Sequence, residues 1–263
     1  MSTGLRSITA YVLHRYDWSE SSVILDLFTR EQGRIAVAAK GAKRPFSQLR
    51  SVLLPFQRLS VSLGRQPAGD ETREVHTLRA AEWAGGHPML TGAALFSGFY
   101  LNELLMKLLA RHDPHAALFD AYAVTIAALS GAGEAQTQAA LRAFEIVLLK
   151  EIGLLPDLGT ETASRRAVVA ERRYLVLADA GVVEADAERE TTTSEATTSG
   201  ATLVALQAAL AADDLRALQQ AAAGALAELR MLLRAQLHYH LGTSQLRTRQ
   251  FMIEAQALGT LER

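Results

Sequence analysis

The sequence predicts an α+β protein with a small N-terminal β-barrel and a mainly α-helical second domain. Apolar and polar residues alternate over the first 80 residues, which is typical of half-buried strands. From residue 88 onward the apolar residues take helical spacing instead. Basic residues are concentrated in the first part of the chain. We therefore expect an OB-fold domain at residues 1–82 and a helical domain at residues 83–263.

Five short strands are expected in the N-terminal domain, at residues 7–14, 22–28, 34–39, 57–63 and 74–78. Turn-like DWSE separates the first two strands, and Glu31-Gln32-Gly33 makes a short reversal between the second and third. The sequence GRQPAGDE at residues 64–71 is typical of a loop. Five strands with a polar basic connection at residues 40–50 favour an OB-fold barrel, and a two-sheet sandwich is the alternative.

Helices are expected at residues 90–109, 116–129, 135–152, 201–210, 213–240 and 244–257. Glycines end the second and third of them. Residues 157–200 are expected to form an irregular insertion that contains the low-complexity sequence TTTSEATTSG. Within this insertion, RRYLVLADAGVV predicts a small hairpin.

Composition excludes several kinds of chemistry. The chain has no cysteine, so it forms no disulfide, thiolate metal site or cysteine nucleophile. No Walker, GxGxxG, HExxH or GxSxG motif occurs, and the seven histidines are scattered. The N-terminus has no signal-peptide pattern, and no apolar run is long enough to span a membrane. We expect a cytoplasmic protein that is not an enzyme and needs no cofactor.

Charge is distributed very unevenly along the chain. Residues 1–79 contain 12 Lys/Arg and 7 Asp/Glu, whereas residues 80–263 contain 15 and 21. Between Leu27 and Arg65 only Glu31 is acidic. The eight basic residues of that stretch are Arg30, Arg34, Lys40, Lys43, Arg44, Arg50, Arg58 and Arg65. Clustered cations on a small β-domain favour a phosphate backbone as ligand, and a solvated basic face is the alternative.

Four segments of the chain resemble the RecO family of bacterial recombination mediators. The first is WSESSVILDLFTREQGRIAVAAKGAKRP at residues 18–45. The second combines LLPFQRLSVSLG at 53–64 with VHTLRAAE at 75–82, and the third combines LFSGFYLNELLMKLL at 95–109 with ALRAFEIVLLKEIGLLPDL at 140–158. The fourth is YHLGTSQLRTRQFM at 239–252. Together they cover nearly the whole chain in the family's order.

The resemblance implies an OB-fold followed by helices, in agreement with the pattern of the residues. It also implies binding of single- and double-stranded DNA, annealing of complementary strands, and loading of RecA on coated single strands without nucleotide hydrolysis. The implied partners are RecR, RecA and the C-terminal tail of single-stranded-DNA-binding protein (SSB). The alternatives are a non-catalytic scaffold whose barrel binds protein, and an enzyme with an unrecognised site.

The sequence departs from the family in two places. Many members have a four-cysteine zinc site after the LLPDL-like motif, whereas residues 159–190 contain no cysteine. We therefore expect no metal. The terminal motif keeps Arg247 and Arg249 but loses the basic character that usually precedes them.

Two sites are predicted. The DNA-binding set is Arg30, Arg34, Lys40, Lys43, Arg44, Phe46, Arg50 and Arg58, with Phe46 as the residue that stacks on bases. Tyr11, Tyr16, Trp18 and Phe56 are also aromatic candidates, but core positions are favoured for them. The resemblance places a basic contact for the partner tail at Arg142, beside an apolar surface of Leu141, Phe144 and Leu148. A solvated Arg142 paired with Glu145 is the alternative.

Overall fold

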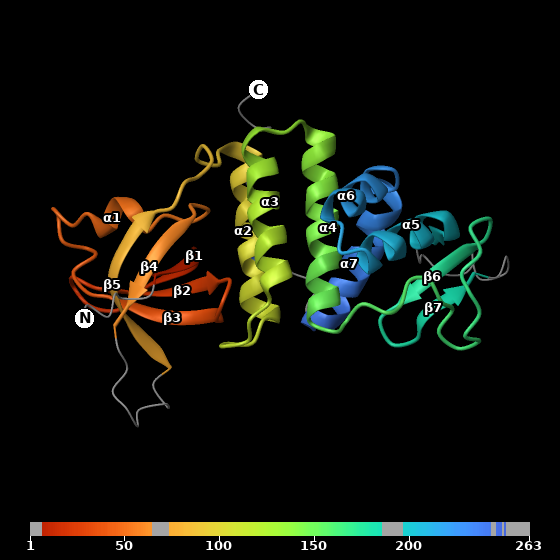
Figure 1. Cartoon of the computed structure of the whole chain (residues 1–263), viewed down its shortest axis with the longest axis horizontal. Coiled ribbons are helices and arrows are strands. Elements are labelled where there is room, and N and C mark those ends of the chain that lie inside the picture. The colour runs from red at the N-terminus through yellow and green to blue at the C-terminus, as the bar shows by residue number, and fades with distance from the viewer. Residues whose placement is uncertain (1–6, 65–73, 186–196, 243–245, 249, 251–263) are drawn as a thin grey trace. The chain divides into compact units, whose positions relative to one another are not determined.

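A closed five-stranded barrel forms the N-terminal part of the chain in a computed structural model (Figure 1). The structure describes residues 7–64, 74–185, 197–242, 246–248 and 250. The strands are β1 (Ser7–Asp17), β2 (Val23–Thr29), β3 (Gly33–Ala39), β4 (Leu59–Leu63) and β5 (Val75–Trp83). Their order around the barrel is β1-β2-β3-β5-β4, with β3 and β5 parallel. The OB-like barrel is confirmed, and the chain does not form the alternative sandwich.

Alternation along the strands builds the core of the barrel. Val23, Leu25 and Leu27 of β2 point inward and are almost completely buried. Successive side chains of a strand point to opposite faces, so Asp26 and Phe28 lie on the outer face of the barrel. Part of this outer face is buried as well, because helices of the same compact unit pack against it.

Two helices cover the outer face of β1 and β2, namely α2 (Gly92–Leu108) and α3 (Ala116–Gly131). Four aromatic rings form the contact. The rings of Tyr11 and Tyr122 have centroids 5.0 Å apart, and those of Phe28 and Phe119 are 5.3 Å apart. Such tilted and edge-to-face arrangements are favourable for aromatic pairs. The barrel and these helices belong to one compact unit, which comprises Met1–Ser130 and Thr248–Arg263.

Asn102 of α2 completes the hydrogen bonding of an irregularity in β1. The pairing of β1 with β2 shifts register between Val12 and His14, and such a bulge removes backbone groups from the ladder. The Asn102 side-chain amide donates to the carbonyl oxygens of Leu13 at 2.9 Å and Val12 at 3.3 Å. Tyr122 in turn donates its hydroxyl to Asn102 Oδ1 at 2.6 Å. The polar residue within YLNELL therefore anchors the helix to the barrel.

The second compact unit, Gly131–Arg247, is mainly helical. Its helices are α4 (Glu134–Glu151), α5 (Gly200–Ala211), α6 (Leu215–Ala223) and α7 (Leu226–Leu241). The prediction of one helix over residues 213–240 is wrong, because α6 ends before Gly224 and the chain leaves helical geometry at Ala225. Glycine weakens a helix interior, and the backbone of Ala225 has φ −137°. The prediction of a helix at 244–257 falls mostly outside the described residues.

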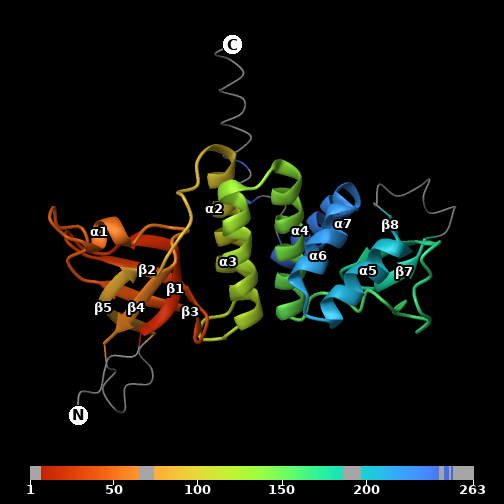
Figure 2. The same cartoon turned by 45° about the horizontal axis from the view of Figure 1, so that its top comes forward.

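The insertion contains a small antiparallel sheet in the order β7-β6-β8. The predicted hairpin is confirmed as β6 (Arg173–Leu177) and β7 (Gly181–Glu184), and β8 (Thr198–Ser199) pairs with β6. Thr162 holds the hairpin in place through two hydrogen bonds. Its amide donates to the Val182 carbonyl at 2.8 Å, and the Val182 amide donates to Thr162 Oγ1 at 2.9 Å. Residues 65–73 of the expected loop and 186–196 of the insertion lie outside the described residues (Figure 2).

Candidate nucleic-acid interface

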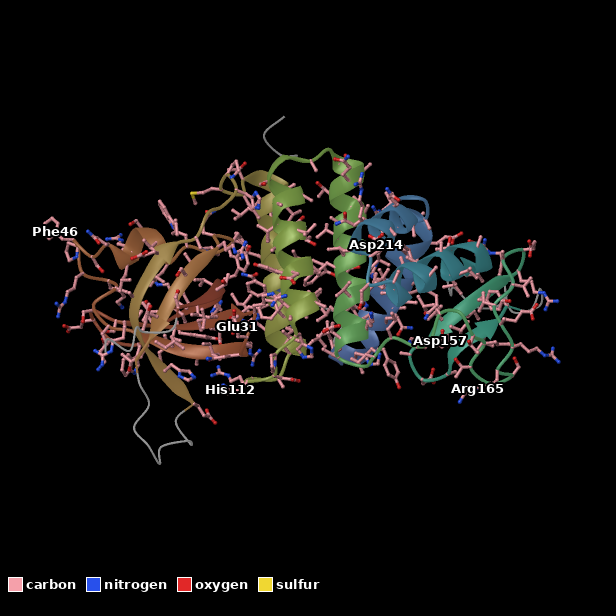
Figure 3. All side chains as sticks on the ribbon, in the orientation of Figure 1. Glu31, Phe46, His112, Asp157, Arg165 and Asp214 are labelled. Atoms are coloured by element: carbon pink, nitrogen blue, oxygen red, sulfur yellow. The ribbon has the colours of Figure 1, made fainter. Side chains whose placement is uncertain are left out.

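Residues 40–48 form a loop between β3 and α1 (Leu49–Val52). The sequence did not predict this short helix. The loop contains Lys40, Lys43, Arg44 and Phe46. Gly41 has φ +73°, and the Arg44 amide donates to its carbonyl at 3.1 Å, so the chain turns sharply there. Phe46 is 99% exposed, and its ring projects away from the barrel (Figure 3). An aromatic side chain in water beside basic residues suits base stacking better than packing.

The loop is fastened to the turn between β1 and β2. The Lys43 amide donates to the Ser21 carbonyl at 2.9 Å, and the Gly41 amide donates to Ser22 Oγ at 3.3 Å. Lys43 Nζ also lies 3.3 Å from Asp17 Oδ1. These contacts fix the base of the loop while Lys40 and Arg44 remain exposed. The two connections therefore form one surface at this end of the barrel.

Trp18 belongs to this surface, although sequence reasoning placed it in the core. It lies in the turn between β1 and β2 and is 55% exposed. The prediction is wrong for Trp18 and also for Tyr16, which is exposed, whereas Tyr11 and Phe56 are buried as expected. The polar residues around Trp18, in DWSESS, are the local signal that favours an exposed turn.

Arg50 and Arg58 are exposed but lie on other elements. Arg50 is in the last turn of α1, and Arg58 precedes β4. Among the described residues, no carboxylate forms an ion pair with Lys40, Arg44, Arg50 or Arg58. Arg65, the last member of the basic stretch, lies outside the described residues.

Arg30 and Arg34 bind groups of the covering helices instead of facing solvent freely. Arg30 donates to both carboxylate oxygens of Asp120 in α3, from Nε at 3.0 Å and from Nη2 at 2.9 Å. The hydrogen bond and charge of Asp120 raise the pKa of Arg30. Arg34 donates from Nη1 to the carbonyl of Met106 in α2. The basic stretch that appears continuous in sequence is therefore divided between two environments.

A buried carboxyl group lies on β2, the strand that pairs with the strand of Arg34. Asp26 is fully buried on the outer face of β2, and Arg111 Nη2 lies 3.1 Å from its Oδ1. The segment that carries Arg111 runs along β3, because the His112 amide donates to the Arg34 carbonyl at 3.0 Å. Burial of charge is tolerated when a partner is present. This part of the barrel therefore holds the helices in place.

The predicted tail site has a different character. Arg142 Nη1 lies 2.8 Å from Glu145 Oε2, so the pairing that the alternative interpretation expected is present. The Arg142 side chain is only 13% exposed and Glu145 is completely buried, so this pair is not a solvated one. Leu141, Phe144 and Leu148 are buried, with at most 4% of their surface exposed. The expected apolar surface on this helix is therefore not accessible, because these side chains are part of the hydrophobic core. A role of Arg142 in tail binding stays a prediction.

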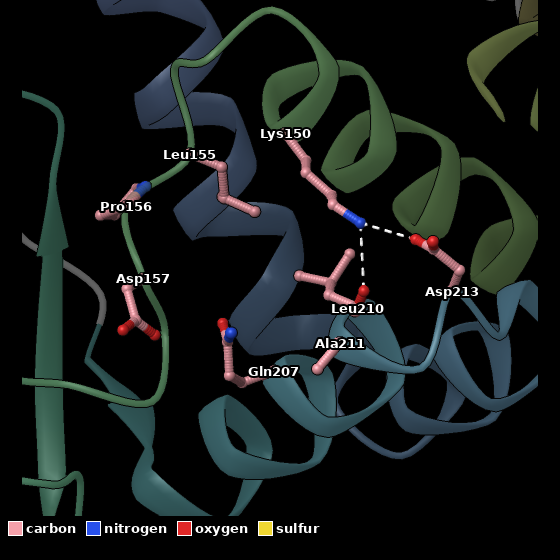
Figure 4. Close-up of a pocket in the computed structure, with 8 residues that line it drawn as sticks. All are labelled: Lys150, Leu155, Pro156, Asp157, Gln207, Leu210, Ala211 and Asp213. Atoms are coloured by element: carbon pink, nitrogen blue, oxygen red, sulfur yellow. Dashed lines mark hydrogen bonds and ion pairs between the residues drawn. The ribbon is translucent and has the colours of Figure 1, made fainter. Parts of the chain in front are cut away.

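The second unit also contains a pocket of about 410 Å³ between the end of α4 and α5 (Figure 4). Leu155, Pro156 and Leu210 contribute to its wall, and Lys150 lies at its edge. The Lys150 ammonium donates to the Leu210 carbonyl at 3.0 Å and to Asp213 Oδ1 at 2.8 Å. This pairing lowers the pKa of Asp213. The lysine charge is thus already compensated within the protein.

An OB-like barrel with an exposed basic and aromatic loop, followed by a helical unit, defines the class of α+β proteins with an N-terminal OB domain. Residues 1–86 match the family model "Recombination protein O N terminal", and residues 89–250 match "Recombination protein O C terminal". The chain belongs to the RecO family of DNA repair proteins. The matches meet near residue 88, where the pattern of the sequence changes from strands to helices.

Several bacterial proteins are similar over almost their whole length. The chain is 52% identical over 260 residues to DNA repair protein RecO of Variovorax paradoxus (strain S110), covering 95% of this chain and 96% of the relative. It is 51% identical over 250 residues to DNA repair protein RecO of Polaromonas naphthalenivorans (strain CJ2), with the same coverage. The protein of Delftia acidovorans (strain DSM 14801 / SPH-1) with that name is 49% identical over 249 residues.

The cysteine-free insertion does not fit the four-cysteine zinc site that the resemblance implies for many family members. Such a site would need thiolates, and the chain contains none. In the described part of the chain, no three His, Asp or Glu residues are arranged to hold a metal ion. No helix there is long and apolar enough to cross a membrane.

Proposed function

We propose that this protein is a non-catalytic recombination mediator that binds DNA, anneals complementary strands and helps to load RecA on SSB-coated single strands. The observation that carries the proposal is the surface formed by the 40–48 loop and the β1–β2 turn. It combines exposed Lys40 and Arg44 with exposed Trp18 and Phe46. Proteins that bind single strands combine cations that follow the phosphates with rings on which bases stack.

Annealing requires neutralisation of charge rather than covalent chemistry. Two complementary strands repel each other through their phosphates, and bound cations reduce that repulsion. The basic N-terminal part supplies these cations, and the sequence contains no Walker, GxGxxG, HExxH or GxSxG motif. We therefore propose that annealing needs neither ATP nor a divalent metal and becomes weaker as salt is raised.

The proposed partners follow from membership in the RecO family. They are single- and double-stranded DNA, the C-terminal tail of SSB, RecR and, functionally, RecA, in the cytoplasm and at the nucleoid. Arg142 is the proposed cationic contact of the tail, because a free carboxylate is well bound by a guanidinium. Its present partner, Glu145, would have to share it.

The decisive experiment mixes complementary oligonucleotides that are coated with SSB, in chelator and without nucleotide. The protein is expected to accelerate annealing at low salt, and the acceleration is expected to decline steeply as salt rises. A failure to accelerate at low salt, or a strict need for ATP or metal, would contradict the proposal. A barrel that binds protein instead would give no annealing, and its binding to an apolar partner would depend little on salt.

A further inference from the structure

The exposed face of α7 is basic, although the unit that contains it is acidic. Residues 131–247 contain 11 Lys/Arg and 15 Asp/Glu. On α7, Leu229, Leu232, Leu233 and Leu237 point into the core, whereas Arg230 and Arg234 are exposed. The two arginines are four residues apart, so they lie on one side of the helix about 6 Å apart along its axis. The local charge of this face is thus opposite to the charge of its unit.

The acidic residue of α7 is directed elsewhere. Glu228 accepts a hydrogen bond from the Ser199 amide at 3.0 Å, and its other oxygen lies 3.5 Å from Arg173 Nη1. Glu228 is therefore engaged by β8 and β6 and does not neutralise the two arginines. Among the described residues, no carboxylate forms an ion pair with Arg230 or Arg234. Both guanidinium groups are available to an external anion.

The side chains beside these arginines favour a nucleic acid over a helical protein partner. Ala227 and Ala235 are exposed neighbours on this face, and Met231 is 46% exposed. A docked amphipathic helix needs several large apolar anchors at helical spacing, whereas this face has one between two small residues. Small neighbours leave the long arginine side chains free to reach phosphates, to which the guanidinium binds in a bidentate manner.

We infer that the exposed face of α7, centred on Arg230 and Arg234, is a second contact for a DNA backbone, separate from the barrel loop. The inference rests on the proposed function and extends it. One strand binds to the loop of the barrel while α7 holds the phosphates of a second strand. A protein that anneals strands gains from two such contacts, because both reactants are then held on one molecule.

The test measures capture of a second strand by the full-length protein. A labelled single strand is bound first, and a second, non-complementary strand with a different label is then added, so that base pairing contributes nothing. Energy transfer between the two labels reports the ternary complex. The double variant Arg230→Ala/Arg234→Ala is expected to lose second-strand capture and to keep first-strand binding. Its slope of log affinity against log salt should fall by about two for the second strand, one for each lost phosphate contact.

Two control variants separate the contribution of this face from the general effect of removing positive charge. Arg165→Ala/Arg166→Ala removes the same charge from exposed positions of the same unit and should leave capture unchanged. Arg230→Lys/Arg234→Lys keeps the charge and should retain most of the capture. Because alanine is favourable in a helix and both positions are exposed, the double alanine variant is expected to fold, as its circular dichroism will verify.

The outcomes distinguish this inference from the proposed function. If Lys40→Ala/Lys43→Ala/Arg44→Ala binds the first strand like the parent while the α7 variant loses the second, the loop proposal fails and the α7 inference stands. Unchanged capture by the α7 variant overturns the inference alone. Loss of binding to polyglutamate with both strands retained overturns it too, since the face would then recognise acidic protein. A parent that binds no strand at low salt overturns both.

Discussion

Two groups of cations in the basic stretch lie in different environments. Arg30 and Arg34 lie against α3 and α2 and donate to Asp120 and to the Met106 carbonyl. The later group, Lys40, Lys43 and Arg44, lies in the 40–48 loop, and Lys43 alone of these three forms an ion pair in the described structure. A cation is available for a ligand only when the fold has not already given it a partner. Charge in the sequence therefore overestimates the charge that can bind DNA.

The largest expected effect is a difference in stability between alanine variants of Gly33, beside the covering helices, and Gly41, in the loop. At Gly33, an added Cβ would lie 1.9 Å from the Asp113 carbonyl oxygen, and φ is +65°. At Gly41, with φ +73°, it would meet only the Arg44 side chain at 3.6 Å. Gly33→Ala should lower the free energy of unfolding by at least about 3 kcal/mol, whereas Gly41→Ala should cost about 1 kcal/mol through its backbone conformation. Denaturant unfolding of both variants measures the contrast, and equal losses would contradict it.

Charge removal should separate the two regions in DNA binding. For Lys40→Ala/Lys43→Ala/Arg44→Ala, the slope of log affinity against log salt should fall by about two, one for each phosphate contact of Lys40 and Arg44, because Lys43 already pairs with Asp17. Arg34→Ala should leave the slope unchanged, and it should cost about 1–3 kcal/mol of stability because the Met106 carbonyl loses its partner. Fluorescence titrations of an oligonucleotide at several salt concentrations provide the measurement. A slope that changes equally in both variants would mean that one continuous face binds DNA.

The aromatic residues of the loop surface sharpen the comparison. Trp18→Ala and Phe46→Ala should each weaken single-strand binding by about 1–3 kcal/mol if one base stacks on each ring. Phe99→Ala, which removes a partly exposed ring that contacts Phe56 in the same unit, serves as the control and should leave binding unchanged. Melting curves establish that the variants fold. Unaltered affinity in both loop variants would exclude stacking on this surface.

The smallest expected effect is a pH dependence of the region that packs on the helices. Burial, and then the charge of His112, lower the pKa of His76, whose ring lies 5.8 Å from that of His112. The neutral form is therefore favoured in the folded state. Its contribution to stability is present above the unfolded pKa of about 6.5 and is lost as pH falls from there through the folded pKa. Melting temperatures at several pH values should show a weaker acid dependence for His76→Gln than for the parent, with exposed His87→Gln as control.

Strand and helix prediction succeeded where a local pattern carries the information. Alternation in the barrel and helical spacing from residue 88 are properties of neighbouring residues, so the fold class and most elements could be predicted. The break at Gly224 and Ala225 was missed, because the apolar pattern continues across it and one glycine is often tolerated in a helix. The short helix α1 was missed for a similar reason, since four residues carry no clear period.

The sequence by itself determined the barrel, the helical unit, the family and the concentration of cations between residues 30 and 58. Only the tertiary structure decided which of those cations already have a partner within the protein. Arg30 meets Asp120 across 90 positions of the chain, and Arg34 meets Met106 across 72. It also decided that Trp18 lies in solvent while Phe144 lies in the core. The physical reason is that availability depends on what packs against a side chain, and such partners are distant in sequence.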